Sequence, residues 1–79
     1  MKSFEISISS IEEMKQFYEY VLSVDCELDL KRGRYCVDAK NMLGIASLGI
    51  KDTFELIIWL DEEIADKLMR KMLEKLEFL

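Results

Sequence analysis

The 79-residue sequence contains no histidine. Histidine is the usual general base near neutral pH, the commonest metal ligand and the acceptor in phosphohistidine chemistry. A glycine-rich phosphate loop and a metal-spaced cluster are missing too. The carboxylates fall on alternating strand faces and at helix starts, as solvated charges usually do. We therefore expect no enzyme activity, no metal site and no cofactor.

Long hydrophobic runs are also missing. The longest, Leu56–Leu60, is too short to cross a bilayer. The first residues, Met1–Glu5, have no apolar signal core. We expect a cytoplasmic protein without membrane insertion. In that compartment Cys26 and Cys36, the two cysteines, are expected to be free thiols.

An excess of positive charge is likewise missing, since the net charge is −5. Nucleic-acid binding normally needs a basic stripe that displaces counterions. Basic residues gather at a predicted hairpin tip (Lys31, Arg32, Arg34) and in the last helix, where they suit the negative end of the helix dipole. Nucleic acid is therefore not an expected partner.

What the sequence does contain is a regular succession of periodic segments, which we interpret as one domain over residues 1–79. Alternation predicts strands at Lys2–Ser9, Asp25–Lys31, Arg34–Ala39 and Thr53–Leu60. Helical spacing predicts one helix from Ile11 to about Ser23 and another that begins at Asp61–Glu63. Their predicted apolar stripes are Ile11, Met14, Phe17, Tyr18, Val21 and Leu22, and Ile64, Leu68, Met69, Met72, Leu73, Leu76 and Leu79.

Local capping signals mark where the helices begin and end. Ser10 with Glu13 three residues later has the form of a capping box. Asn41 is a natural N-cap for a short apolar helical turn, and Gly49 stands where a left-handed C-cap would fall. About eight residues are too few for a stable isolated helix, so this turn must lie on a scaffold.

A turn at Arg32-Gly33 predicts a hairpin. In the register that we expect, Leu30 faces Tyr35, Leu28 faces Val37, Cys26 faces Ala39 and Cys36 faces Asp29. The two thiols then point to opposite faces of the sheet, and no disulfide forms.

The element order β-α-β-β-α-β-α predicts an α+β fold. We expect a two-layer open-faced sandwich, in which three helices cover one face of a four-stranded, mostly antiparallel sheet. A ferredoxin-like fold is the alternative. Its second crossover helix should cover the sheet, and Asn41–Leu48 is too short for that.

The segments Lys40-Asn41-Met42-Leu43-Gly44 and Ser47-Leu48-Gly49-Ile50, within Gly33–Leu60, are similar to the corresponding stretch of a known family. With the element order, they make the chain resemble HPr, the histidine phosphocarrier of the sugar phosphotransferase system. The resemblance implies the HPr-like fold over the whole chain. It also implies protein partners from that system.

The departures from the family fall at its functional positions. The phosphohistidine loop is replaced by a shorter junction around Ser9 and Ser10, without histidine, arginine or proline. A serine ester would not pass its phosphate onward readily, so neither serine replaces the histidine. The regulatory serine matches Asn41, which keeps the cap and loses the hydroxyl. Ser47 matches a second family serine, but phosphate there would be disfavoured near the helix C-terminus.

A docking surface can be retained after phosphotransfer chemistry has been lost. The resemblance implies docking through the first helix and the short second helix, where Met42 and Leu43 keep apolar character. Glu12 and Glu13 bring acid where the family has a positive arginine, which would slow docking to acidic partners. The alternative is that Met42 and Leu43 merely cover the edge of the core.

The open face of the predicted sheet carries Ile57 and Trp59, with Cys36 on the same side. Aromatic residues dominate interface hot spots, so this face predicts an interface, with a second copy of the chain as one partner. The alternative is that long neighbouring side chains cover Trp59.

Two hypotheses follow for function. One is a non-phosphorylatable HPr-like regulatory or docking protein. The other is a binding or self-assembling module that uses the Ile57/Trp59 face and is unrelated to phosphotransfer.

Overall fold

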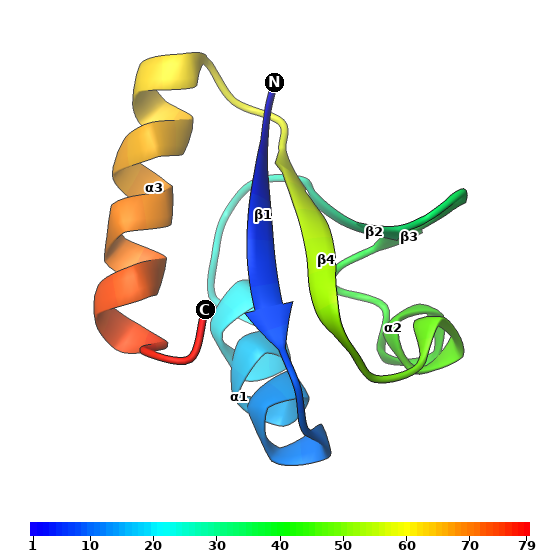
Figure 1. The fold of residues 1–79 in the computed structure, drawn as a ribbon. Coiled ribbons are helices and arrows are strands. Elements are labelled where there is room, and N and C mark those ends of the chain that lie inside the picture. The colour runs from blue at the N-terminus through cyan, green and yellow to red at the C-terminus, as the bar shows by residue number, and fades with distance from the viewer.

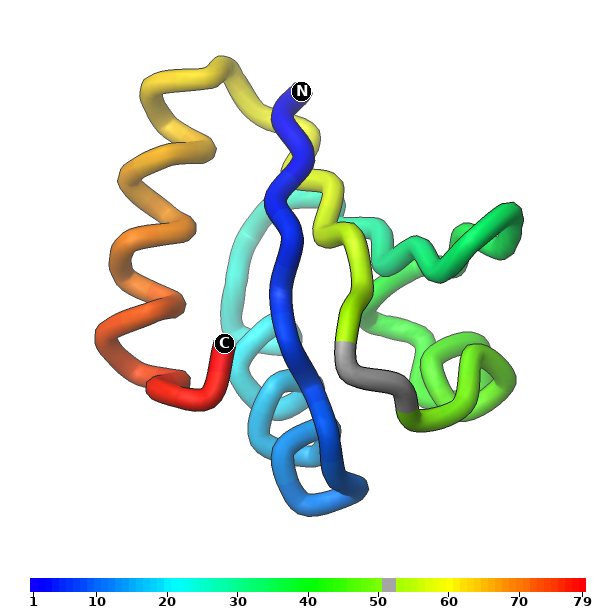
Figure 2. The backbone as a smooth tube through the Cα atoms, in the orientation of Figure 1, coloured from blue at the N-terminus to red at the C-terminus, as the bar shows by residue number. Residues whose placement is uncertain are grey.

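The computed structural model describes residues 1–50 and 53–79 with their side chains (Figures 1 and 2). The elements follow in the predicted order: β1 (Lys2–Ile8), α1 (Ile11–Leu22), β2 (Leu28–Arg32), β3 (Tyr35–Asp38), α2 (Met42–Leu48), β4 (Lys51–Ile58) and α3 (Glu62–Lys75). After α3 the chain turns back toward the sheet (Figure 2), where Phe78 and Leu79 pack against the core.

The strands form one sheet in the order β1-β4-β2-β3, and each neighbouring pair is antiparallel. The predicted open-faced α+β fold is confirmed. The ferredoxin-like alternative is wrong, because α2 spans only seven residues and contacts β3 rather than covering the sheet.

All three helices contribute to one core on one face of the sheet. Alternate strand residues point into it, as period-2 side-chain alternation requires. From the sheet these are Ile6, Ile8, Leu28, Leu30, Phe54, Leu56 and Ile58. From the helices they are Met14, Phe17, Val21, Ile45, Leu48, Ala65, Met69 and Met72.

The predicted helical stripes are too wide. Ile11 and Leu22 of α1 are exposed, because they lie roughly 60–80° around the helix from Met14, at the two ends of the helix. Ile64 and Leu73 of α3 are exposed as well. Ala65 was not predicted in the core, yet it is fully buried.

The hairpin register differs from the prediction by two residues. Arg32 pairs with Tyr35, and Leu30 pairs with Val37. The turn is Gly33-Arg34, because Gly33 takes a positive φ of 62° at the first turn position, as glycine does in type II′ hairpins. A shift of two leaves every side chain on its predicted face.

Two other predicted strand ends are wrong. Strand β2 begins at Leu28, so Cys26 does not pair with Ala39, whose N–H bonds to the Leu28 carbonyl instead. Strand β4 ends at Ile58, before Trp59 and Leu60. The prediction that the cysteines are free is confirmed.

Candidate docking surface

The junction between β1 and α1 consists of Ser9 and Ser10, and both hydroxyls are used in capping. Ser10 Oγ accepts the Glu13 N–H at 3.1 Å. Glu13 Oε1 accepts the backbone N–H of Ser9 at 2.9 Å and its hydroxyl at 3.2 Å. A standard capping box would return to the N–H of Ser10. Here the carboxylate takes the N–H of Ser9, which follows the last residue of β1, so the junction is held tightly.

The short helix α2 begins and ends as predicted. Asn41 Oδ1 accepts the Gly44 N–H at 3.1 Å, which identifies Asn41 as the N-cap. Gly49 ends the helix with φ 74° and ψ 176°, a region open essentially to glycine alone. Ser47 is exposed, and its hydroxyl donates to the Gly44 carbonyl at 2.6 Å.

The core holds α2 in place from below. Ile45 and Leu48 are buried, and an ideal Cβ on Gly44 would lie 3.1 Å from Cβ of Val37, so α2 approaches β3 closely. The guanidinium of Arg32 donates to the Leu48 carbonyl, one of the carbonyls left unpaired at the helix end. The position of α2 is therefore determined from two sides.

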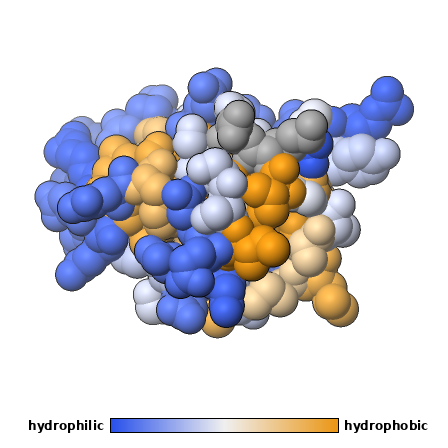
Figure 3. All heavy atoms as spheres, turned by 60° about the horizontal axis from the view of Figure 1, so that its bottom comes forward, coloured by the Kyte–Doolittle hydropathy of each residue, from blue (hydrophilic) through white to orange (hydrophobic). Residues whose placement is uncertain are grey.

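The upper side of α2 faces solvent. Leu43 is 83% exposed and Met42 is 45% exposed. Ile11, at the start of α1, is 71% exposed, and Ile50 is exposed after the glycine stop. Figure 3 views the molecule from the side of α1 and α2 and shows hydrophobic atoms gathered on part of this face.

A groove of about 290 Å³ lies between α1 and α2. It is lined by Ile11, Met14 and Lys15 from α1, and by Met42, Ile45, Ala46, Gly49 and Ile50 from α2 and the residues after it. We call it the α1–α2 groove. Leu43 is exposed on the same short helix. Such a contiguous exposed apolar surface is typical of protein-interaction sites.

Sequence reasoning found Met42 and Leu43 but missed two residues of this surface. Ile11 was assigned to the core because its spacing matches the α1 stripe. Ile50 lies between the predicted helical turn and the predicted strand at Thr53–Leu60, so it was assigned to neither. For Ile11 the available signal was its position, because Ile11 is the first helical residue, directly after the N-cap.

The comparison with solved structures finds proteins of similar fold. The crystal structure of HPr-C-His from Thermoanaerobacter tengcongensis is similar, with a TM-score of 0.72, over 94% of this chain and 92% of that chain. This chain has the HPr-like fold. The sequences are 24% identical, so the likeness concerns the fold. No family model and no curated protein matches the sequence.

In this HPr-like fold, the sheet face that points away from the helices is mostly polar. Its apolar residues are the predicted pair, Ile57 and Trp59. The strand registers place Ser3, Ile57, Asp29 and Asp38 in one row across the sheet, and Glu5, Glu55, Lys31 and Cys36 in the next. Cys36 is exposed, as predicted for a residue on the open face.

The prediction that Ile57 is exposed on the open face is wrong. Its side chain is only 8% exposed, whereas Trp59 is 46% exposed. Ile57 lies between Ser3 of β1 and Asp29 of β2. The Trp59 indole N–H bonds to Asp29 at 2.8 Å, which draws the ring toward Ile57. Neighbouring side chains therefore cover Ile57, whereas nearly half of the tryptophan surface stays accessible.

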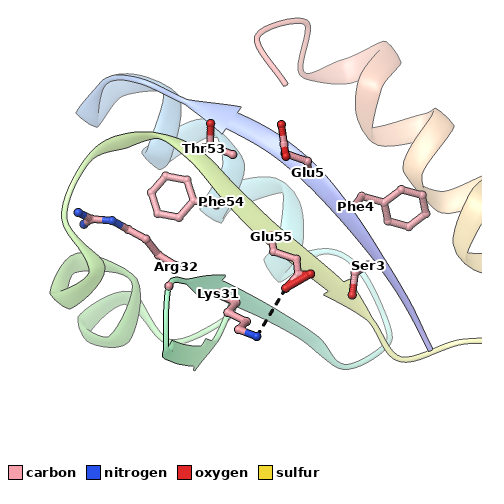
Figure 4. A pocket seen from close by; sticks show the side chains of 9 residues that line it. Ser3, Phe4, Glu5, Lys31, Arg32, Thr53, Phe54 and Glu55 are labelled. Carbon is pink, nitrogen blue, oxygen red and sulfur yellow. Dashed lines mark ion pairs between the residues drawn. The ribbon is translucent and has the colours of Figure 1, made fainter.

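A hollow of about 350 Å³ lies on the open face (Figure 4). Glu5, Lys31 and Glu55 line it from three neighbouring strands, and Lys31 Nζ lies 3.9 Å from Glu55 Oε1. Because this ion pair is exposed, it is weak. Among the described residues, no polar or charged side chain is buried, so none of those lining the hollow is.

Other site chemistry is limited. Burial raises the pKa of the Cys26 thiol, which disfavours the reactive thiolate. Among residues 1–50 and 53–79, no three Cys, Asp or Glu side chains gather closely enough to hold a metal ion. Within the described part of the chain, no helix has the length and hydrophobicity needed to cross a membrane.

Proposed function

We propose that this chain is a non-catalytic, cytoplasmic HPr-like docking protein that binds a phosphotransferase-system protein through the α1–α2 groove without carrying a phosphoryl group. The observation that carries the proposal is the exposure of Ile11, Met42 and Leu43 around this groove on a firmly held α2.

Loss of phosphotransfer is supported by the composition and by the junction geometry. The chain has no histidine. Ser9 and Ser10 are occupied in capping α1, and a serine phosphate ester transfers its phosphoryl group poorly. At the start of α2, Asn41 caps the helix with an amide oxygen and offers no hydroxyl for phosphorylation. Each position therefore has a structural role that does not need phosphate.

Docking is supported by the cost of leaving these side chains in water. Burying a large aliphatic side chain contributes roughly 1.5–3 kcal/mol. Leu43 and Met42 are not needed to complete the core, which Ile45 and Leu48 already fill from the same helix. The sequence-based alternative, in which Met42 and Leu43 cover the core edge, does not account for an 83% exposed leucine.

The charges beside the groove affect the rate of docking. Glu13 is engaged by Ser9, which leaves the exposed Glu12 as the free acid of the first turn. Lys15 lines the groove and offers a positive charge to a partner. An acidic partner is therefore attracted by Lys15 and repelled by Glu12, so we expect Glu12→Lys to speed association at low salt.

The experiment is an NMR titration of the ¹⁵N-labelled protein with enzyme I, the phosphoryl donor of the phosphotransferase system. We expect shifts confined to Ile11–Tyr18 and Asn41–Leu48. Leu43→Glu should weaken binding at least about tenfold, because it places a charge in a desolvated contact. Leu22→Glu is the matched control, because Leu22 is also exposed on α1 but lies at its other end.

The outcomes are distinct. An absence of shifts at stoichiometric concentration, or equal binding by the Leu43 and Leu22 variants, would contradict docking through the groove. Incubation with phosphorylated enzyme I should leave the protein mass unchanged. A gain of one phosphate would contradict the non-phosphorylatable role.

Self-association through the open face is the second candidate, and the half-exposed Trp59 is the observation that favours it. The rows of the sheet put Glu5, Glu55, Asp29 and Asp38 on that face, so two copies would bring like charges together. Comparing the solution mass of the wild type with that of Trp59→Lys tests this, and a monomer in both cases excludes it.

A further inference from the structure

A second apolar groove lies on the opposite side of the fold from α2, beside α3 (Figure 1). Its volume is about 280 Å³. We call it the α3 groove. Its apolar lining comes from Val24 and Cys26 before β2, from Leu60 after β4, and from Ile64 and Leu68 of α3. None of these residues belongs to the α1–α2 groove.

The apolar lining is accessible. Ile64 is 50% exposed, and Val24, Cys26, Leu60 and Leu68 are all only half-buried. Ile64 and Leu68 are four residues apart, so they form a ridge along one side of α3. A partner that covered this ridge would remove apolar surface from water, which favours binding.

The wall of the α3 groove is basic, although the chain as a whole is acidic. Lys67 and Lys71 line it one helical turn apart. Neither forms an ion pair within 4.0 Å with any described residue. Lys40 donates its Nζ to the Val24 carbonyl, which brings a third ammonium to the same loop. Asp25 is the single acid in the lining.

We propose that the α3 groove binds an acidic amphipathic helix of a partner protein, which has bulky apolar side chains on one face and carboxylates beside them. The apolar ridge takes the hydrophobic side chains, and Lys67 and Lys71 face the carboxylates. Charge complementarity selects this occupant. A second copy of the basic wall would repel the first, and an anionic membrane is an alternative occupant that the test below distinguishes.

This proposal does not rest on docking through the α1–α2 groove, since the two grooves share no lining residue. If both operate, the chain can hold two partners at once, one at α2 and one at α3.

The test is an NMR titration of the full chain with a synthetic amphipathic peptide built from leucine and glutamate. We expect saturable shifts at Val24–Cys26 and Ile64–Lys71. Emission of Trp59 should also change, because Trp59 is adjacent to the lining residue Leu60. Lys71→Glu should weaken binding at least about tenfold by placing a like charge against the peptide. Lys75→Glu is the matched control, since it makes the same charge change on α3 outside this groove.

Each other outcome overturns the proposal. These outcomes are equal binding of a leucine–lysine peptide, equal weakening by the two lysine variants, shifts confined to Ile11, Met42 and Leu43, or an absence of shifts. Binding to phosphatidylglycerol vesicles without peptide binding would assign the groove to lipid instead. The Leu43→Glu variant should keep full peptide affinity, so failure here and failure of docking to enzyme I can be told apart.

Discussion

Trp59 donates its indole N–H to the carboxylate of Asp29, with 2.8 Å between Nε1 and Oδ2. Asp29 lies on β2 directly opposite Ile57 of β4, so this bond restrains the indole on the open face near Ile57. The tryptophan is 46% exposed, so an interface built on Trp59 would use the exposed part of its ring.

Breaking this contact should loosen the indole and expose Ile57. We expect Asp29→Ala to lower the free energy of unfolding by about 0.5–1 kcal/mol, the range for a hydrogen bond that water can partly replace. Tryptophan emission should shift to longer wavelength. Asp29→Asn retains an acceptor oxygen and should change both readouts less. Glu27→Ala, which removes a carboxylate opposite Trp59 without removing this bond, is the control, and an equal effect there would exclude the Asp29 contact as the cause.

Gly49 should be the least replaceable glycine in the chain. Its φ of 74° and ψ of 176° are accessible essentially to glycine alone, and an ideal Cβ would lie 3.1 Å from Arg32 Nη1, the group that holds the end of α2. We expect Gly49→Ala to destabilise by about 2–3 kcal/mol in urea unfolding. Gly33 also has a positive φ, but nothing lies within 4 Å of an added Cβ. We expect Gly33→Ala to cost about 1 kcal/mol, and the reverse ranking would contradict this account.

The two thiols should differ in reactivity. Burial raises the pKa of Cys26, and the Lys40 ammonium partly opposes that rise. Less thiolate is then present at neutral pH, so iodoacetamide should label the exposed Cys36 before Cys26, as measured by peptide mass spectrometry. Labelling of Cys26 should reach its plateau at a higher pH than that of an ordinary thiol. Lys40→Gln should raise the pKa of Cys26 further and slow its labelling, and Lys75→Gln should leave its rate unchanged.

Lys2 and Asp66 tie the first strand to the last helix, with 2.6 Å between Nζ and Oδ1. The hydrogen bond to Asp66 is the main reason that the pKa of Lys2 is raised, and the charge of Asp66 adds to it. A group whose pKa is higher in the folded state contributes stability at all pH values below its ordinary pKa and loses it as pH rises through the folded value.

We therefore expect the stability gap between the wild type and Asp66→Asn to be constant near neutral pH and to shrink above about pH 10.5, the ordinary pKa of lysine. Chemical denaturation at a series of alkaline pH values measures this. Glu74→Gln, on the same helix, should show no such pH dependence. A gap that persisted unchanged to high pH would mean that the pair does not contribute through the charge of Lys2.

Local sequence signals predicted the helix caps, because each cap depends on only a few neighbouring residues. Ser10 and Asn41 accept backbone N–H groups at helix starts, and Gly49 ends a helix. Each of these roles involves groups within four residues, so it can be derived from the sequence. The hairpin register was harder. Both Arg32-Gly33 and Gly33-Arg34 could form a two-residue turn that contains a glycine. The structure has the Gly33-Arg34 turn, in which Gly33 takes a positive φ at the first turn position.

Burial was the least predictable property. Ile11 has core spacing and is exposed, whereas Ile57 points away from the helices and is buried. Both outcomes depend on residues distant in sequence: Ile11 lines the α1–α2 groove, while Ser3 and Asp29 flank Ile57 and Trp59 bonds to Asp29. Periodicity predicts which face of a helix or strand a side chain lies on, but it does not predict which other residues cover that face.

Alternation, capping and composition are local properties, so they establish the order of elements, the helix caps, the faces of the strands and the lack of histidine. The positions of the apolar grooves depend instead on tertiary packing. Ile11, Met42 and Ile50 meet because α1 and α2 pack at one end of the sheet, and Cys26, Leu60 and Ile64 meet because α3 folds back beside the loop that leads into β2. Such surfaces arise where separate elements meet, and the geometry of that meeting depends on the packing of the whole core.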